Sequence, residues 1–309
     1  MRVWSVLMGT VLASALGCGE AGEASPPHGT GQGLRIVCTT TMIADLAGEI
    51  AGEHGQVTGI MKPGEDPHTY EVRPRDAQTL ADADVVLMNG LHLEATLNHI
   101  VEHNARKDAV VARLAEHAAI TPLGKQGAER SGAPDPHCWF NVAYFKLYAE
   151  GVRDALTKAD AAHAADYAAR TEAYLRQLDE LDAWVREQIA VIPAERRVLI
   201  TSHDAFAYYG QAYGVQVHAV IGISTEQQPR PQDIARLEQQ VRDHGVKALF
   251  IETSVSNTLN DLVRKVASAT GATIGGTLYS DSLGDADSPA ATYLDMVRHN
   301  TTTIVQALR

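Results

Sequence analysis

The stretch LRIVCTTTMIADLAGEIAGEHGQVTGIM, residues 34–61, sets a pattern that recurs along the chain. Its β-branched residues 34–40 predict a strand, the apolar spacing over residues 42–51 predicts a helix, and residues 56–61 predict a second strand. A strand, a helix and a second strand in this order form a βαβ unit, whose strands lie parallel in a sheet covered by helices. This stretch therefore predicts an α/β fold.

The same alternation continues through the rest of the chain. In the first half it predicts a helix over residues 74–83 and strands over residues 84–89 and 109–112. In the second half it predicts strands over residues 197–202, 215–221, 247–252 and 273–279. Helices are predicted over residues 234–244 and 259–270, the second ended by Gly271 as a C-cap. The pattern indicates two Rossmann-like lobes with parallel sheets, residues 34–160 and residues 194–309.

A different pattern separates the lobes. Residues 161–192 contain no glycine, and apolar side chains recur at helical spacing from Tyr167 to Ile189, while charged residues fill the other face. At a rise of about 1.5 Å per residue, about thirty residues extend roughly 45 Å, which is long enough to run along both lobes. We therefore predict a single long linking helix within residues 161–193.

The first residues predict an export signal and not a part of the fold. A short positive start is followed by an apolar stretch, residues 3–16, that is too short to span a bilayer well, and small residues precede Cys18. This arrangement is typical of a bacterial lipoprotein signal, in which the cysteine is acylated. We expect a signal peptide over residues 1–17, lipidation of Cys18 and a flexible Gly-, Pro- and Ser-containing tether over residues 18–33. A plain secretory signal is the alternative.

Composition sets further limits. The 309 residues are 45% hydrophobic and 21% charged, which is ordinary for a globular protein with a sizeable core. The formal net charge of −12 argues against nucleic acid as a partner, because phosphates require a basic surface. Cys38 and Cys138 leave two possibilities open. An oxidising compartment permits a disulfide between them, whereas burial as two separate thiols is the simpler expectation.

A duplicated tripeptide carries the first chemical signal. Asp66-Pro67-His68 and Asp135-Pro136-His137 repeat the sequence DPH in two separate loops. Proline fixes its own φ and biases the preceding residue toward extended conformations, so each histidine is presented from a stiff turn. We expect each aspartate either to accept a hydrogen bond from a neighbouring backbone N–H or to orient the imidazole. A single loop histidine is usually just solvated, but two in the same uncommon setting favour metal ligation.

A third histidine and an aspartate stand at strand ends. His203 follows the predicted strand 197–202, and Asp281 follows the last predicted strand, 273–279. Ligands of open α/β sheets bind at the carboxyl ends of strands. Each residue also has an ordinary interpretation, since a histidine there can cap a helix and an aspartate there is a common turn residue. Together with the two tripeptides they supply two candidates from each lobe, and we predict that all four converge in an interlobe cleft.

Three imidazoles and one carboxylate suit a divalent transition metal. Neutral imidazole binds zinc, copper, iron and nickel well, and the carboxylate also admits manganese. Binding requires deprotonated histidines, so the metal affinity is expected to fall as pH drops below about 6. Other histidines are weaker candidates: His92 is a minor candidate for a place beside the ligands, whereas His99 and His103 share a helix face that favours a polar surface.

At these residues the chain resembles the zinc- and manganese-binding class of ABC-transporter solute-binding lipoproteins, the TroA-like family. The resemblance extends from residue 35 to residue 308 and rests on the segments KPGEDPHTYEVRP, ADVVLMNGLHLE, DPHCWF, ITSHDAFAYYG, IGISTE, IETSVS and LYSDSLG. It implies a class III solute-binding protein with an interlobe site for Zn²⁺ or Mn²⁺. The ligands that it implies are His68, His137, His203 and Asp281.

Two departures from the family pattern bear on the metal. Residues 124–134 lack the histidines that strict zinc members often carry before the second DPH. His203 stands where dedicated manganese members usually have glutamate. The chain therefore resembles the subgroup with three histidines and one aspartate, which serves either metal.

We expect an extracytoplasmic, membrane-anchored monomer that has no enzymatic activity and delivers Zn²⁺ or Mn²⁺ to an ABC permease. A zinc hydrolase is one alternative, with Glu226 or Glu252 as the base, although either glutamate is more simply a polar loop or structural contact. A catalytic zinc usually keeps a position open for water beside three protein ligands, so four protein ligands count against this alternative. A surface adhesin on the same scaffold is the other alternative.

Overall fold

The first lobe is built around a parallel sheet with the strand order β2-β1-β3-β4. The computed structural model that shows it describes Met1, residues 33–123 and residues 134–309. The strands are β1 (Leu34–Cys38), β2 (Gly55–Gly59), β3 (Val85–Met88) and β4 (Val110–Arg113). The helices are α1 (Thr41–Ala51), α2 (Pro74–Asp82), α3 (Ala95–Asn104) and α4 (Val142–Ala159). Each strand predicted in this half is present, and its ends lie within two residues of the prediction.

Alternate residues of these strands face two different layers of helices. Ile36 and Leu87 pack in one core cluster with α1 and α4. Val37 and Val86 pack in another cluster with residues of α2 and α3. The period-two alternation of a strand therefore buries both faces of the sheet, which explains the apolar runs Ile36–Cys38 in β1 and Val85–Met88 in β3.

The second lobe repeats the parallel arrangement. Its strands are β5 (Val198–Thr201), β6 (Gln216–Ala219), β7 (Ala248–Glu252) and β8 (Thr273–Leu278). Its helices are α6 (Ala207–Tyr213), α7 (Pro231–Asp243), α8 (Asn257–Thr270) and α9 (Tyr293–Leu308). β5 pairs with β6 and β7 pairs with β8, in parallel in both cases, and β5 lies beside β7. Gly271 adopts a left-handed conformation with φ 75° at the end of α8, as its predicted role as C-cap requires.

The two lobes begin one helix each with the same short motif. Arg73-Pro74 opens α2, and Arg230-Pro231 opens α7. The third helical residue is an aspartate in both, and its carboxylate accepts the backbone N–H of the arginine before the proline. Proline suits this first position because a backbone N–H there would have no partner within the helix, so its absence in proline costs nothing. The repeated motif is local support for two lobes of similar construction.

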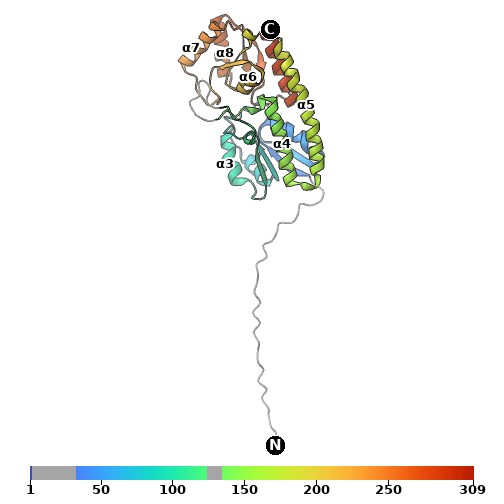
Figure 1. Cartoon of the computed structure of the whole chain (residues 1–309). Coiled ribbons are helices and arrows are strands. Elements are labelled where there is room, and N and C mark those ends of the chain that lie inside the picture. The colour runs from blue at the N-terminus through green and yellow to red at the C-terminus, as the bar shows by residue number, and fades with distance from the viewer. Residues whose placement is uncertain (2–32, 124–133) are drawn as a thin grey trace. The chain divides into compact units, whose positions relative to one another are not determined.

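The predicted linking helix is α5 (Ala164–Ala190). It packs against α4 and α1 of the first lobe and against α9 of the second, and Figure 1 shows it running beside helices of both. The predicted apolar face is buried, and Thr171 is buried with it: Tyr167, Tyr174, Leu178, Leu181, Val185 and Ile189. The α/β fold with two parallel-sheet lobes and one long helix is therefore confirmed.

Among the α-helices of the described residues, α4, α6 and α9 were not predicted from the sequence. In α9 the buried face includes Asn300 and Thr301, which interrupt the apolar period. Asn300 is accommodated because its side chain bonds to both backbone groups of Tyr279, just beyond β8. A polar residue with a full set of partners can occupy a core position that a hydrophobic pattern cannot reveal.

The thiols and the export signal complete the comparison with the sequence. Cys38 and Cys138 are buried and unpaired, as the simpler expectation had it. The predicted signal peptide, Cys18 and almost the whole of the tether lie outside the described residues, as does most of the loop 124–134. Among the described residues, no helix is both long and apolar enough to cross a membrane.

Candidate metal site

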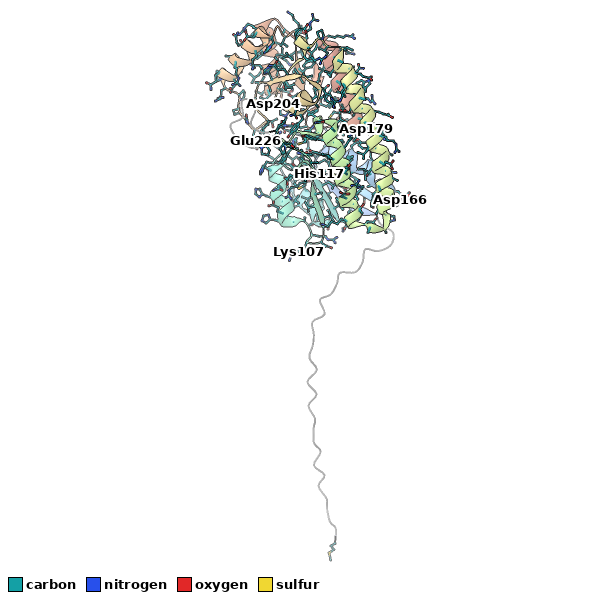
Figure 2. All side chains as sticks on the ribbon, viewed as in Figure 1. Lys107, His117, Asp166, Asp179, Asp204 and Glu226 are labelled. Carbon is teal, nitrogen blue, oxygen red and sulfur yellow. The ribbon has the colours of Figure 1, made fainter. Side chains whose placement is uncertain are left out.

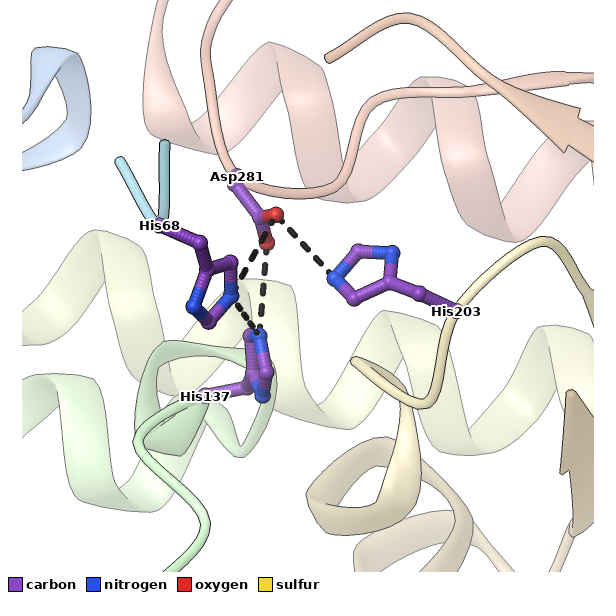
Figure 3. A group of neighbouring side chains, drawn as sticks. All are labelled: His68, His137, His203 and Asp281. Carbon is purple, nitrogen blue, oxygen red and sulfur yellow. Dashed lines mark hydrogen bonds and ion pairs between the residues drawn. The ribbon is translucent and has the colours of Figure 1, made fainter. Parts of the chain in front are cut away.

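Four side chains from distant parts of the chain converge in one place. His68, His137, His203 and Asp281 each bring one ligand atom within 4.8 Å of the ligand atoms of the other three. Figure 3 shows the imidazoles gathered around the carboxylate of Asp281. His203 Nε2 lies 3.0 Å from Asp281 Oδ2, His137 Nε2 lies 3.5 Å from Oδ1, and His68 Nε2 lies 3.9 Å from Oδ2. The structure thus brings together the four residues that the sequence singled out.

The two candidates of the second lobe follow strand ends, as predicted. His203 comes two residues after β5 ends at Thr201, and Asp281 comes three residues after β8 ends at Leu278. Both side chains are fully buried. The backbone N–H of Asp281 donates to the hydroxyl of Ser254 at 3.1 Å, which fixes the turn that carries the carboxylate. The rule that ligands meet at the carboxyl ends of parallel strands accounts for both positions.

Glu252, the last residue of β7, holds His203 in place. Its Oε1 accepts the backbone N–H groups of Ser202 and His203 at 2.7 and 2.9 Å. Its Oε2 lies 2.7 Å from His203 Nδ1. The ring is therefore fixed with Nε2 toward Asp281, in the manner of a carboxylate that orients a metal-binding histidine. A glutamate at the end of the apolar strand KALFIE is the sequence signal for this role, and the structural contact considered for Glu252 is the one observed.

Asp135 does the same for His137 within the second tripeptide. Its Oδ1 accepts the backbone N–H of His137 at 3.0 Å and lies 2.7 Å from the ring Nδ1. Both roles expected of the aspartate are therefore present in one residue. In the first tripeptide, Asp66 Oδ1 accepts the backbone N–H of His68 at 2.9 Å, which is the first of the two expected roles.

The loop that carries His137 is fastened from several sides. Asn89 donates from its amide to the carbonyl of Pro136 at 3.0 Å, and Asn89 itself accepts the hydroxyl of Tyr148 at 2.6 Å. Two tyrosines of the second lobe also donate to this loop. The hydroxyl of Tyr208 donates to the backbone carbonyl of Asp135 at 2.7 Å, and the hydroxyl of Tyr293 donates to the backbone carbonyl of Trp139 at 2.7 Å.

A further hydrogen bond connects this loop to the segment that bears Asp281. The indole N–H of Trp139 donates to the carbonyl of Ser280, the neighbour of Asp281, at 3.2 Å. This bond links the loop of His137 to the segment of Asp281 and helps to position the two side chains relative to each other.

The electrostatics of the group favour a cation beside Asp281. Burial lowers the pKa of His68 to about 3, so its imidazole is neutral at neutral pH. Burial opposes the charge of Asp281, but the imidazoles, His203 above all, hold the pKa of its carboxyl well below the usual range. Burial likewise opposes charge on His203, yet Asp281 and Glu252 outweigh it and raise the pKa of His203 well above its ordinary value. A divalent cation bound here would compete with the His203 proton for Asp281.

The donor set fits a metal. Apart from the ion-pair contacts with the imidazoles, neither oxygen of Asp281 accepts a hydrogen bond from any residue that the structure describes. A buried carboxylate without such partners is costly, and a cation that it shares with imidazoles removes that cost. Three nitrogens and one or two oxygens suit zinc and also admit manganese.

The weaker candidates lie elsewhere. Within the described part of the chain, His92, His99 and His103 do not join the group, and all three are exposed. His92 does lie in an unusual backbone conformation, since Leu91 and His92 have φ of 51° and 63° directly after Gly90. Glu226 is exposed on the loop that follows β6 (Figure 2).

Comparison with known proteins gives a consistent family. The family model described as zinc-uptake complex component A, periplasmic, matches residues 36–307. The chain is 36% identical over 307 residues to the manganese-binding lipoprotein MntA of Bacillus subtilis. The matched region covers 98% of this chain and 99% of that protein. It is 37% identical over 275 residues to the zinc-binding protein TroA of Treponema pallidum, which covers 88% of each.

Solved structures are similar over almost their whole length. The periplasmic zinc-binding protein TroA from Treponema pallidum matches with a TM-score of 0.83 at 36% identity, covering 89% of this chain and 99% of that one. A manganese-bound periplasmic metal-binding protein from Candidatus Liberibacter asiaticus matches with a TM-score of 0.80 at 29% identity, covering 89% and 100%. The arrangement of the two lobes is therefore shared with both.

Proposed function

Since this chain belongs to the family of zinc-uptake complex component A periplasmic proteins, we propose that it is the extracytoplasmic solute-binding component of an ABC importer for a divalent transition metal. The metal is its cargo. The ligands in this proposal are His68, His137, His203 and Asp281. The observation that carries it is the buried carboxylate of Asp281, which three imidazoles surround and no other described residue bonds.

Zinc and manganese are the proposed cargoes. Three imidazoles favour zinc, and at almost any site of this kind zinc binds more tightly than manganese. Relatives of similar identity are named for manganese and for zinc, so tight binding and biological cargo need not coincide.

The geometry favours binding over catalysis. Four protein side chains around one ion leave less room for a catalytic water than three do. Of the two glutamates considered as a base, Glu252 is already engaged by His203 and two backbone N–H groups, and Glu226 is exposed. We therefore propose a carrier without enzymatic activity.

The remaining parts of the proposal concern location and partners. We propose that Cys18 is lipidated and anchors a monomer to the outer face of the cytoplasmic membrane, where it delivers metal to an ABC permease. Relatives named as lipoproteins support the anchor. Metal uptake that depends on both this protein and its permease would separate this function from a surface adhesin on the same scaffold.

Metal content is the first test. Purified protein is analysed by mass spectrometry for bound metal, stripped, and titrated with zinc and with manganese beside Asp281→Ala. We expect one equivalent of metal in the parent protein and an affinity at least about 100-fold lower in the variant. The absence of stoichiometric binding, or an unaffected variant, would refute the proposed site.

A further inference from the structure

The carboxylate of Asp66 joins the two lobes. Its Oδ1 serves its own loop by accepting the N–H of His68, but its Oδ2 accepts the hydroxyl of Thr225 at 2.6 Å. Thr225 lies in the second lobe, in the segment between β6 and α7. The hydrogen bond therefore spans 159 positions of sequence and ends on the residue two before His68.

This bond lies on the more open side of the candidate site. The side chain of His68 is 5% exposed, whereas those of His137, His203 and Asp281 are 0% exposed. A surface hollow beside it is lined by residues that include Glu65, Asp66 and Glu71. Because water reaches His68 first, we expect His68 to be the first ligand to separate from a departing ion.

We propose that Asp66 and Thr225 form a clasp between the lobes that holds the His68 loop in its binding position and slows the release of metal. The part concerning metal rests on the proposed function. Thr225 is not one of the four converging residues, so it acts through Asp66 as a positioning residue. A hydrogen bond to a carboxylate is stronger than one between neutral groups, so its loss should loosen the loop measurably.

A second link between the lobes lies close to the clasp. The backbone N–H of Gly64 donates to the hydroxyl of Ser282 at 2.8 Å, and Ser282 follows Asp281. Breaking the Thr225 bond leaves the Gly64 bond between the His68 loop and the second lobe, while buried Tyr70, which donates to Asp76, still holds the loop within the first lobe. This predicts a change confined to two segments and not a loss of fold.

The first test uses the metal-free protein. Thr225→Val removes the hydroxyl and keeps the shape, Thr225→Ser restores the hydroxyl, and Thr277→Val changes an exposed threonine of β8 as a matched control. Hydrogen exchange is followed in peptides covering residues 64–70 and residues 222–228. We expect Thr225→Val to raise exchange in both segments and the other two variants to match the parent. Faster exchange in residues 222–228 alone would overturn the clasp.

The second test measures kinetics with zinc alone. Zinc-loaded protein is mixed with an excess of a chromophoric chelator in a stopped-flow instrument, and association is measured separately. Thr225→Val should release zinc about ten-fold faster, with little change in association, and Thr225→Ser should behave like the parent. An unchanged release rate in Thr225→Val would overturn the proposal. If the parent protein bound no zinc, the proposed function would fail, while the exchange experiment would still decide whether the clasp exists.

Discussion

The two DPH tripeptides are identical in sequence and differ in what holds them. Asp135 turns its carboxylate inward and orients the ring of its own histidine, and the loop around it is fastened by Asn89, Tyr208 and Tyr293. Asp66 keeps one oxygen for its own loop and with the other accepts the hydroxyl of Thr225 in the second lobe. A short motif thus supplies a stiff turn and a carboxylate, and the surrounding fold decides whether the carboxylate orients a ligand or connects two lobes.

The difference divides the candidate site into an anchored side and an adjustable side. His137 belongs to the anchored side, where many bonds would have to break before the ring moved. His68 belongs to the adjustable side, which two hydrogen bonds connect to the second lobe. Exchange of a cargo requires one side that yields and one that keeps its geometry, and these two tripeptides are suited to those roles.

Removing each histidine is the strongest way to break the comparison. His68→Ala and His137→Ala should each lower zinc affinity by more than about 100-fold, because each deletes a ligand. Without metal the two should differ. His68→Ala should melt close to the parent, whereas His137→Ala should lose about 2 kcal/mol, because its ring is fully buried against Trp139. Calorimetry of the stripped proteins measures this, and equal melting temperatures would contradict the division.

Replacing each aspartate by asparagine sharpens the comparison between the two tripeptides. Asp135→Asn should lower zinc affinity about 10- to 100-fold, because the ring of His137 loses the carboxylate that orients it. Asp66→Asn should have the smaller effect on affinity, because the ring of its own histidine does not depend on it. Competition titration against a calibrated chelator gives both values. A larger loss in the Asp66 variant would mean that the roles are reversed.

The anchoring amide of Asn89 tests the fixed side alone. Asn89→Ala leaves the carbonyl of Pro136 and the hydroxyl of Tyr148 without their buried partner, so the free energy of unfolding should fall by about 2 kcal/mol. The exposed Asn104→Ala is the control and should change it little. Denaturant unfolding of the metal-free proteins measures the difference, and equal stability of the two variants would remove Asn89 from the anchor.

The stability of the anchored side should depend on pH through Asp45, whereas that of the clasp should not. Asp45 accepts the backbone N–H of Tyr293 at 2.8 Å, and burial, with Glu49 and Asp295 nearby, raises the pKa of Asp45 to about 6. Because the folded pKa lies above the unfolded one, this group contributes stability that is complete below about pH 4 and is lost as pH rises through about 6.

Asp45→Asn should abolish that contribution. Between about pH 7 and pH 4 the parent should gain about 1 kcal/mol relative to the variant, a value reduced for partial exposure to solvent. Unfolding curves at both pH values measure this difference. Thr225→Val, which breaks the clasp and keeps Asp45, should show the same pH response as the parent. The same pH response in both Asp45→Asn and the parent would exclude Asp45 as its source.

Local patterns predicted most of the fold and the four residues that converge. Strand ends located His203 and Asp281, and the repeated tripeptide located His68 and His137. These signals are local because a strand, its following turn and the side chain there are neighbours in sequence. The linking helix was equally accessible, because its buried face keeps a regular apolar period.

The partners of the site residues were not accessible in the same way. Glu252 meets His203 from a position 49 residues away, and Thr225 meets Asp66 from 159 residues away. Such pairings depend on how strands order themselves in space, which no local periodicity encodes. The identical tripeptides make the limit plain, since nothing within DPH distinguishes the Asp that orients a ring from the Asp that reaches across.

The packing of α9 has a consequence for how the protein comes to be folded. α1, the first helix of the described chain, and α9, the last, contribute to one core cluster, and Tyr293 of α9 stacks on Phe145 at 3.5 Å between ring centroids. A polypeptide that crosses a membrane unfolded, from its first residue to its last, cannot complete this core until α9 has emerged. In the proposed export, the early segments would stay unpacked and open to chaperones until α9 follows, because contacts between residues so distant in sequence are slow to form.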